Sequence, residues 1–308
     1  MKVLAGQWRS WDGPGGDTSV TIGVLDGVHI GHRALIARLD QKLIRTVLTF
    51  DPHPVEVLRP GTHPRLVTTI EERIGLLAGA GADCVGVLDL TEIKEQAPEE
   101  FVEAVLIAKL RIAHLVVGED FRFGRDRSGD VALLRKLAPD LGFEVETIEL
   151  VADGHGAVSS SRVRSLIEEG DVAAASTILS TWFRLTGTVV EGDKRGRELG
   201  FPTANLRPPG RKVIPATGVY ACFATVRGAR RDAAVNVGVR PTFGGGELLV
   251  EAYVLDFDED LYGQEMTLEF VSYLRPELNF DSVADLVARM GEDVENARII
   301  LSDARGRM

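Results

Sequence analysis

Hydrophobic positions in the first half of the chain follow two alternating patterns. Short apolar runs typical of buried strands are separated by segments in which apolar residues recur every three or four positions, as on one face of a helix. Strands are predicted at 20–24, 46–50, 84–88, 114–118 and 144–150, and helices at 69–78, 98–110 and 131–137. This alternation predicts an α/β domain with a parallel sheet covered by helices on both faces.

The pattern changes after Trp182 to short strands separated by turn residues. These strands are predicted at 188–190, 220–226, 233–237, 248–257 and 266–273. Such spacing is typical of a small antiparallel barrel or sandwich. Two short helices, 161–169 and 172–179, are expected just before it.

A last amphipathic helix is predicted to begin at Ser282, with Asp285 as a candidate for a capping box. Its expected buried face consists of Val283, Leu286, Val287, Met290, Val294 and Leu301. A chain of 308 residues is long enough for two domains, and residues 153–156 read as a flexible break. Because the pattern changes near Trp182, we expect domains at 1–180 and 181–308, with the terminal helix in the second.

Composition narrows the classes of function. The net charge of −11 argues against general nucleic-acid binding, which requires a basic surface. Cys84 and Cys222 lie far apart without CxxC spacing, so neither a disulfide scaffold nor a zinc site is indicated. The N-terminal residues lack the apolar core of a signal peptide, and no apolar run approaches the length of a membrane span. We expect a cytoplasmic protein without nucleic-acid or membrane partners.

The most informative segment follows the first predicted strand, where the chain passes through Gly23, Gly27 and Gly31 into a helix. The unpaired N–H groups and the dipole at a helix start attract phosphate. His29 and His32 are three residues apart and therefore lie on one side of the first turn. Both could contact the same phosphate chain. The alternative is a tight turn with two exposed imidazoles.

Three further polar clusters follow predicted strands or open a predicted helix. In residues 49–54, prolines fix the direction of Asp51 and His53. Residues 118–124 offer aromatic, carboxylate and cationic side chains, and residues 159–164 place hydroxyls and arginines at a helix start, which suits phosphate oxygens. Ligands of α/β sheets bind at the carboxyl ends of the strands. Taken singly, the clusters could also be a rigid turn, core aromatics and a helix cap.

In the second half, a glycine-rich segment carries Lys194, Arg195 and Arg197 but lacks the ending of a Walker A loop. If the chain after it is extended, Thr203 and Asn205 point to the same face. Their two neutral oxygens could bind Mg²⁺, which prefers oxygen ligands and shares its coordination shell with substrate phosphates. The alternative is a glycine-rich hairpin with a solvated basic tip.

One carboxylate interrupts the apolar strand predicted at 248–257. Glu251 shares a face with Leu249 and Tyr253. Burial would raise the pKa of its carboxyl and make it a stronger proton acceptor near neutrality. From the residues alone, an outward glutamate on the barrel surface is equally compatible.

Together these segments resemble the bacterial bifunctional riboflavin kinase/FAD synthetase family, and the two helix starts of the first half resemble the nucleotidyltransferase superfamily. The matching motifs are 23–32, 49–54, 118–124, 159–164, 192–206, 215–220, 236–243 and 260–263. The resemblance implies a Rossmann-like nucleotidyltransferase domain followed by a riboflavin kinase β-barrel with a terminal helix. Leu25 departs from the family, which usually has Phe there, and this alters the packing beneath the loop.

For the first domain, the resemblance implies transfer of AMP from ATP to FMN with release of pyrophosphate. His29 and His32 would bind the ATP phosphates and stabilise charge on the attacked α-phosphate. The glycines expected to approach these phosphates are Gly23, Gly27 and Gly31. The residues expected to hold the outgoing pyrophosphate are Ser160, Ser161 and Arg162. The flavin and nucleotide pocket would include His53, Asp120 and Phe121.

For the second domain, the resemblance implies phosphorylation of riboflavin to FMN by ATP. Thr203 and Asn205 correspond to the Mg²⁺–ATP site, and Glu251 corresponds to the base that takes the proton from the riboflavin 5′-hydroxyl. Arg275 would approach the flavin. The residues expected to bind the ATP phosphates are Gly192, Lys194, Gly196, Arg197 and Gly200.

We therefore predict a bifunctional enzyme that binds riboflavin, FMN, FAD and ATP and requires Mg²⁺ for both steps. It is expected to be a monomer or a weak homo-oligomer. One alternative is a version with a single activity, and another is a non-catalytic flavin or nucleotide sensor on the same scaffold. The sensor is disfavoured because every charged or hydroxyl group that each reaction needs is present.

Overall fold

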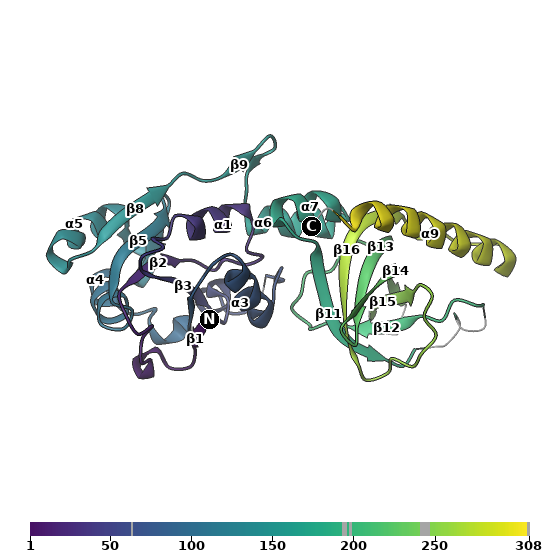
Figure 1. Ribbon diagram of the computed structural model, residues 1–308, viewed down its shortest axis with the longest axis horizontal. Coiled ribbons are helices and arrows are strands. Elements are labelled where there is room, and N and C mark those ends of the chain that lie inside the picture. The colour runs from purple at the N-terminus through teal and green to yellow at the C-terminus, as the bar shows by residue number, and fades with distance from the viewer. Residues whose placement is uncertain (63, 193–195, 197–198, 241–246, 307–308) are drawn as a thin grey trace. The chain divides into compact units, whose positions relative to one another are not determined.

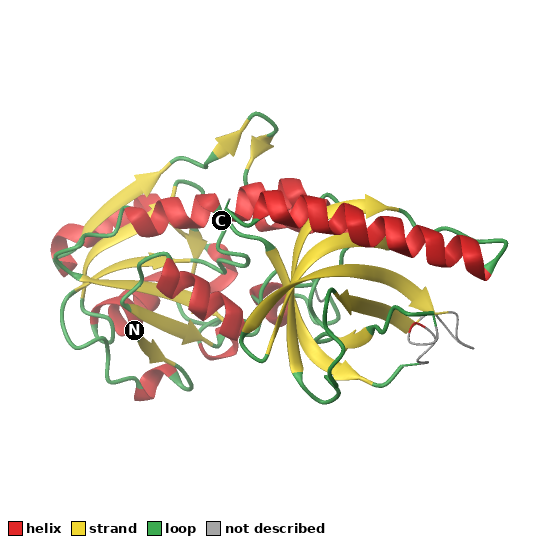
Figure 2. Cartoon of the chain, turned by 45° about the vertical axis from the view of Figure 1, so that its right-hand side comes forward, coloured by secondary structure: helices red, strands yellow, loops and turns green. Residues whose placement is uncertain are grey.

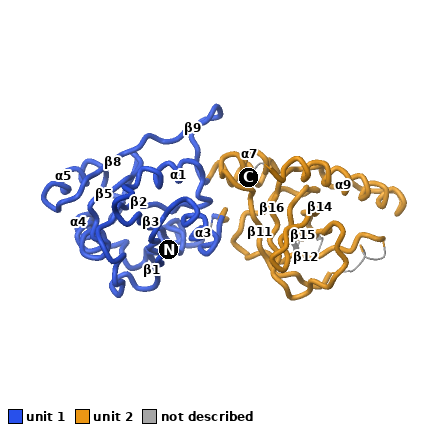
Figure 3. The backbone as a smooth tube through the Cα atoms, viewed as in Figure 1, with its two compact units in different colours: residues 1–64, 68–160 blue, residues 65–67, 161–308 orange. Residues whose placement is uncertain are grey.

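The computed structural model describes residues 1–62, 64–192, 196, 199–240 and 247–306, and the chain forms two compact units (Figure 3). One unit comprises residues 1–64 and 68–160, and the other comprises residues 65–67 and 161–308. The short segment 65–67 belongs to the second unit because its backbone pairs there. The Leu66 N–H donates to the Arg211 carbonyl at 2.7 Å, and the Val213 N–H donates to the Leu66 carbonyl at 2.9 Å.

The first unit is built on a parallel sheet with the spatial strand order β1, β4, β3, β2, β5, β8 (Figure 1). The bounds of these strands are Lys2–Leu4, Cys84–Leu88, Ile44–Phe50, Thr18–Ile22, Ile112–Gly118 and Glu144–Ile148. From β2 the chain adds β3 and β4 on one side and β5 and β8 on the other, so the strand order reverses between β2 and β5. The predicted parallel sheet is confirmed. Strand β1 was not predicted.

Both faces of this sheet are buried under helices. Successive side chains of a strand point to opposite faces, so each strand contributes to both sides of the core. In β3, Val47 packs on one side and Leu48 on the other, and both are fully buried. Helices α1 and α3 cover the Val47 side, and α4 and α5 cover the Leu48 side. The bounds of these helices are Ile30–Ala37, Ile70–Gly79, Pro98–Phe101 and Val131–Leu141.

The predicted helix 98–110 has a mixed geometry. It begins as α4 and continues as a π-helical segment, Val102–Ile107. The remaining elements of this unit are short. They are the 3₁₀ turns Trp8–Ser10, Leu90–Glu92 and Arg125–Arg127, helix α2 (Pro54–Leu58), the pair β6 (Arg122–Phe123) and β7 (Gly129–Asp130), and the pair β9 (Ala152–Asp153) and β10 (Gly156–Ala157).

The second unit contains a closed antiparallel barrel with the strand order β11, β12, β15, β14, β13, β16 (Figure 1). The bounds of these strands are Phe183–Val190, Ala204–Arg207, Glu247–Val254, Ala229–Arg240, Gly218–Val226 and Glu265–Arg275. The sequence left a barrel and a sandwich open. Strand β11 pairs with β16 and closes the sheet, so the fold of this unit is a barrel and not a sandwich.

Helices α6 (Ser160–Glu168) and α7 (Val172–Leu179) precede the barrel, and α9 (Val283–Ala304) packs against β13, β14 and β16 (Figure 2). Ser282 caps α9, because its hydroxyl oxygen accepts the Asp285 N–H at 3.1 Å. The predicted burial of Val283 is wrong: its side chain is 64% exposed, as is typical of a first turn that lies outside the packed part of a helix.

Candidate active sites

Loops after three adjacent strands of the parallel sheet carry predicted residues of the first domain. The loop after β2 leads to His29 and to His32 in the first turn of α1, the loop after β3 carries His53, and the loop after β5 carries Asp120 and Phe121. Strands β3, β2 and β5 are neighbours and parallel, so their carboxyl ends meet at one edge of the sheet (Figure 1). The three clusters therefore come together where such sheets bind ligands.

His29 and His32 are held together at the start of α1. His29 is the N-cap residue, and its Nδ1 accepts the His32 backbone N–H at 3.4 Å. The two rings stack with centroids 3.5 Å apart and an interplanar angle of 19°. Gly31 allows this packing, since a Cβ at that position would lie only 3.2 Å from atoms of the His29 ring. His29 is 4% exposed, so a turn with two exposed imidazoles is not what forms.

Burial lowers the pKa of both imidazoles. Loss of solvation lowers the pKa of His29 to about 4, and the Asp26 carboxylate opposes that shift. Loss of solvation also lowers the pKa of His32 well below its ordinary value, and the charges of His29 and Arg73 act in the same direction. Both rings are therefore neutral near pH 7, and each can donate one N–H to an anion. A phosphate beside them would favour their charged forms.

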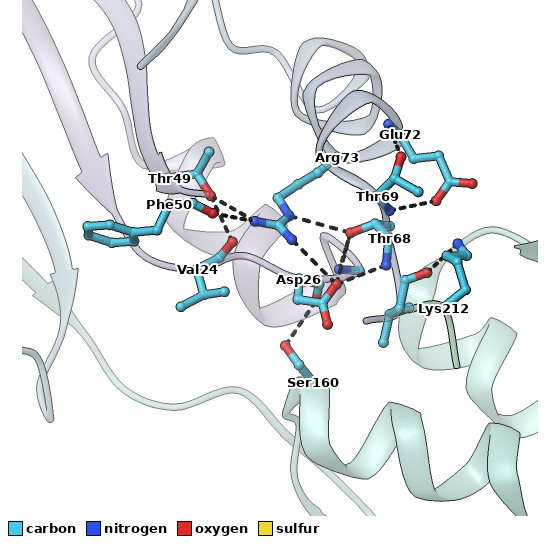
Figure 4. Close-up of polar contacts among 12 residues, drawn as sticks. Val24, Asp26, Thr49, Phe50, Thr68, Thr69, Glu72, Arg73, Ser160 and Lys212 are labelled. Carbon is cyan, nitrogen blue, oxygen red and sulfur yellow. Dashed lines mark hydrogen bonds and ion pairs between the residues drawn. The ribbon is translucent and has the colours of Figure 1, made fainter. Parts of the chain in front are cut away.

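A buried polar network fixes the loop that leads to His29 (Figure 4). Asp26 Oδ1 accepts the backbone N–H and the hydroxyl of Thr68, each at 2.9 Å. Thr68 Oγ1 in turn accepts the Gly27 N–H at 3.1 Å. Gly27 has a φ of 82°, which only glycine adopts readily. The turn before the histidines is thus held by a side chain distant in the sequence.

Arg73 extends this network from α3 to a second loop (Figure 4). Its Nη2 lies 3.8 Å from Asp26 Oδ1, and neither side chain is more than 2% exposed. Its Nη1 donates to the Phe50 carbonyl at 3.1 Å and to Thr49 Oγ1 at 3.3 Å. Phe50 ends β3, three residues before His53. One buried guanidinium therefore fixes the loops after both β2 and β3.

The loop also contains backbone strain. Leu25 and Val28 have φ values of 54° and 44°, in the left-handed region. Such conformations are unfavourable for a β-branched residue and cost on the order of 1–3 kcal/mol. Both side chains are buried, at 2% and 0% exposure, so core packing stabilises the strained backbone. Strain of this kind is concentrated at functional loops.

The predicted pyrophosphate residues begin α6. The Ser160 hydroxyl donates to the Asp26 carbonyl at 2.9 Å, which ties it to the same loop (Figure 4). Ser161 and Arg162 are the next two residues of α6. Their role in holding pyrophosphate stays a prediction.

The predicted flavin-pocket residues of the first domain differ in their surroundings. His53 caps α2, with its Nδ1 accepting the Val55 N–H at 3.2 Å. Asp120 is exposed. Phe121 is half-buried and stacks on Phe123, with ring centroids 5.6 Å apart. Phe121 therefore packs against the core while it remains partly accessible at the sheet edge.

The second unit contains a cavity of about 540 Å³, within the range of roughly 300–1,000 Å³ usual for small-molecule sites. Glu251, Leu249 and Tyr253 all line it, which confirms that they share a face. The connection 276–281 and α9 complete the lining. Their cavity residues are Glu277, Leu278, Phe280, Leu286, Met290, Asp293 and Val294.

Three polar residues form a row across neighbouring barrel strands. Glu251 of β15 is paired with Asn205 of β12 on one side and with Asn236 of β14 on the other. Residues directly opposite on antiparallel strands have Cβ atoms about 4.5–5.5 Å apart and share a face. Asn236 lines the same cavity as Glu251. Asn236 was not predicted as a site residue, because the register of paired strands cannot be derived from the sequence of one strand.

Asn205 has the surroundings of a metal ligand. It is 7% exposed, and its Oδ1 has no hydrogen-bond partner within the described part of the chain. A Cβ at Gly192 would overlap the Asn205 amide, and a Cβ at Gly196 would lie 3.4 Å from Thr203 Oγ1. Buried polar atoms normally have a partner. An amide oxygen in such a glycine-lined cradle fits a Mg²⁺ ion that is shared with substrate phosphates.

The structure says less about the other residues that were predicted to bind the ATP phosphates. Lys194 and Arg197 lie outside the described residues. Gly200 is exposed and has a φ of 85°. Thr203 also lines a second cavity of about 50 Å³, formed with residues 257–262. Thr203 therefore lies between two cavities.

Arg275 lines the large cavity, as does Asp293 of α9, and the two form an ion pair with 2.6 Å between Nη2 and Oδ2. Asp293, Thr68 and Arg73 were not predicted as site residues from the sequence. Of these, only the burial of Arg73 could have been predicted from the sequence. Arg73 shares a helix face with the fully buried Leu77, four residues later. A charge on an apolar helix face indicates a buried partner.

Comparisons with known proteins assign the family. A model described as FAD synthetase matches residues 15–162, and a model described as riboflavin kinase matches residues 179–301. The bifunctional riboflavin kinase/FMN adenylyltransferase of Listeria monocytogenes is 36% identical over 91% of this chain and 91% of that protein. The chain belongs to the bifunctional riboflavin kinase/FMN adenylyltransferase family. The predicted resemblance is thereby confirmed.

Two further proteins are similar to this chain over nearly its whole length. The bifunctional riboflavin kinase/FMN adenylyltransferase of Escherichia coli K12 is 34% identical over 97% of both chains. A crystal structure named as a macrolide-efflux protein from Streptococcus pneumoniae has a TM-score of 0.88 and 29% identity, covering 97% of this chain and 99% of that one. Among the described residues of the chain, no helix has the length and apolarity to cross a membrane.

Proposed function

We propose that the chain converts riboflavin to FMN at residues 181–308 and FMN to FAD at residues 1–180, with ATP as co-substrate in both steps. The observation that carries this proposal is that each half has its own family model and its own polar site. One site is the His29/His32 pair at a helix start, and the other is Glu251 between two asparagines.

In the adenylylation step, a phosphate oxygen of FMN attacks the α-phosphorus of ATP, and the bond to the β-phosphate oxygen breaks. Such in-line transfer depends on positioning and charge stabilisation, with no covalent nucleophile. His29 and His32 donate N–H groups to the phosphate oxygens. Because both rings are neutral before ATP binds, proton uptake on binding adds positive charge where negative charge accumulates.

Other residues of this site support the transfer. The leaving pyrophosphate is held at the start of α6 by Ser160, Ser161 and Arg162. The Asp26–Arg73 network keeps the loop glycines close to the phosphates. The sheet-edge residues that flank the flavin and the nucleotide are His53, Asp120 and Phe121.

In the kinase step, Glu251 accepts the proton of the riboflavin 5′-hydroxyl while that oxygen attacks the γ-phosphorus of ATP, and ADP leaves. A positioned base of this kind contributes about 10²- to 10⁴-fold in rate. Thr203 and Asn205 would hold Mg²⁺, which when bound screens the charge of the phosphates. The large cavity takes the flavin.

Product analysis tests the proposal. The purified protein is incubated with riboflavin, ATP and Mg²⁺, and the flavins are separated over time. FMN is expected first and FAD second, with pyrophosphate released alongside FAD. One product alone would support the single-activity alternative. Formation of neither product would contradict the proposal and leave the sensor alternative standing.

A further inference from the structure

The ion pair between Arg275 and Asp293 lies at the large cavity and is made by several short contacts between the two side chains. Arg275 Nε lies 2.9 and 3.0 Å from the two Asp293 oxygens, and Nη2 lies 2.6 Å from Oδ2. The two side chains are 10% and 6% exposed. Arg275 Nη1 donates to the Pro276 carbonyl at 2.9 Å, and Arg289 Nε approaches Asp293 Oδ1 at 3.5 Å. The Arg275 guanidinium is thus largely occupied by protein acceptors.

This pair connects the two ends of one cavity wall. Arg275 is the last residue of β16, and Asp293 lies in the third turn of α9. Between them run the connection 276–281 and the first turns of the helix. Leu286 and Met290 are four residues apart and Asp293 follows three later, so all three lie on one helix face. All three line the cavity.

The bonding pattern fixes the direction of the wall as well as its attachment. A planar guanidinium that grips a carboxylate with two nitrogens allows little rotation of either side chain. An apolar contact of the same size would hold the helix with less directional control, and buried ion pairs add little net stability over such contacts. The geometry therefore favours a role in orientation over a role in overall stability.

We propose that Arg275 and Asp293 are positioning residues of the kinase site. Their ion pair sets the orientation of α9 and of the 276–281 connection, and so shapes the apolar wall that receives the ring system of the acceptor substrate. The inference rests on the proposed kinase function of the barrel. Arg275 is thereby assigned to the protein wall, whereas the family resemblance implied that it approaches the flavin.

The test is a steady-state comparison of Asp293→Asn with the unmutated enzyme. Asn keeps the volume and one acceptor oxygen but removes the charge that holds the guanidinium fork. The KM for riboflavin is expected to rise about tenfold, while the KM for ATP and the kcat of FMN formation stay within about twofold. FAD formation from added FMN is expected to be unchanged, because its site uses none of these residues.

The chain offers a matched control. Asp256→Asn removes a second ion pair of α9, between Arg298 and Asp256 at 2.9 Å, which is exposed and does not line the cavity. Asn tolerates the positive φ of 56° at this position. The Asp256→Asn enzyme is expected to keep the KM for riboflavin of the unmutated enzyme. Arg275→Lys, which keeps a charge but loses the fork, is the second variant if Asp293→Asn unfolds.

The outcomes separate this inference from the proposed function. An unmutated protein that makes no FMN contradicts the proposed function itself. If FMN is made, an unchanged KM for riboflavin in both Asp293→Asn and Arg275→Lys overturns the inference. An equal rise in the KM values for riboflavin and ATP also overturns it, as does an Asp256→Asn effect equal to that of Asp293→Asn.

Discussion

Glu251 of β15 lies directly opposite Asn205 of β12, so the proposed base and the proposed Mg²⁺ ligand are neighbours in one row of the barrel. The register of two paired strands is rigid, and it keeps the acceptor hydroxyl and the nucleotide phosphates within reach of one another. The kinase site therefore depends on strand pairing, whereas the adenylylation site depends on loops.

Asn205→Ala removes the buried amide oxygen that has no described partner. The Mg²⁺ concentration needed for half-maximal FMN formation is expected to rise about tenfold or more, since an oxygen ligand is lost. Asn205→Asp is the matched variant, and it should keep a low Mg²⁺ requirement. Flavin assays over a Mg²⁺ series measure this. Identical Mg²⁺ curves for Asn205→Ala and the unmutated enzyme would rule Asn205 out as a ligand.

His29 is predicted to titrate far below an ordinary histidine. Its pKa in the folded protein is about 4, because burial disfavours the charged ring. The unfolded chain has the ordinary value of about 6.5 and binds more protons between these values. Stability is therefore expected to be full above pH 6.5 and to fall as the pH drops toward 4.

NMR titration of the imidazole protons measures this pKa directly, with the resonance assigned by comparison with His29→Asn. Addition of ATP should raise the midpoint, because the phosphate anion favours the charged ring. A midpoint near 6.5 in the free protein would show that the ring is not buried in solution. A midpoint that ATP leaves unchanged would contradict phosphate binding at His29.

Arg73→Met is expected to damage the first unit alone. Removal of one partner from a buried ion pair costs about 3–5 kcal/mol, and here it also releases the loops after β2 and β3. FAD formation from FMN should fall strongly, and FMN formation from riboflavin should persist. Thermal unfolding and separate assays of the two steps measure this.

Arg45→Met is the matched control, since Arg45 pairs with Asp83 at 2.8 Å in an exposed ion pair of the same unit. Its loss is expected to cost less than about 1 kcal/mol and to leave both reactions intact. Equal losses of FAD formation in the Arg73 and Arg45 variants would show that the buried network has no special role.

The periodicity of apolar residues predicted most helices and strands, because the spacing typical of each element lies within a short stretch of sequence. Strand Cys84–Leu88 and helix Val172–Leu179 have the predicted bounds. The predicted burial of Val283 was wrong because an apolar residue at the end of a helix can fit the helical spacing and still lie outside the core. Closure of the barrel depends on the pairing of β11 with β16, more than 75 residues apart, and local spacing carries no information about it.

The site was predictable where a motif is contiguous. His29 and His32 lie in one turn, so their proximity follows from spacing. Asp293 lies 18 residues after Arg275, and only the docking of α9 brings them together. Asn236 meets Glu251 only through register. Residues that act through tertiary contacts were thus the ones missed.

The central claim is that two separate sites in one chain act in succession, and a mixing experiment tests it. Glu251→Gln should lose FMN formation by about 10²- to 10⁴-fold and still convert added FMN to FAD. His32→Ala should form FMN and lose FAD formation by about 10²- to 10³-fold. These opposite defects follow from the proposed base and the proposed phosphate ligand.

The most direct measurement is the amount of FAD made from riboflavin, ATP and Mg²⁺ by an equal mixture of His32→Ala and Glu251→Gln. Neither variant alone should make appreciable FAD. The mixture should make FAD readily, because FMN released by one protein is the substrate of the other. A mixture that makes no more FAD than its components would contradict two independent sites.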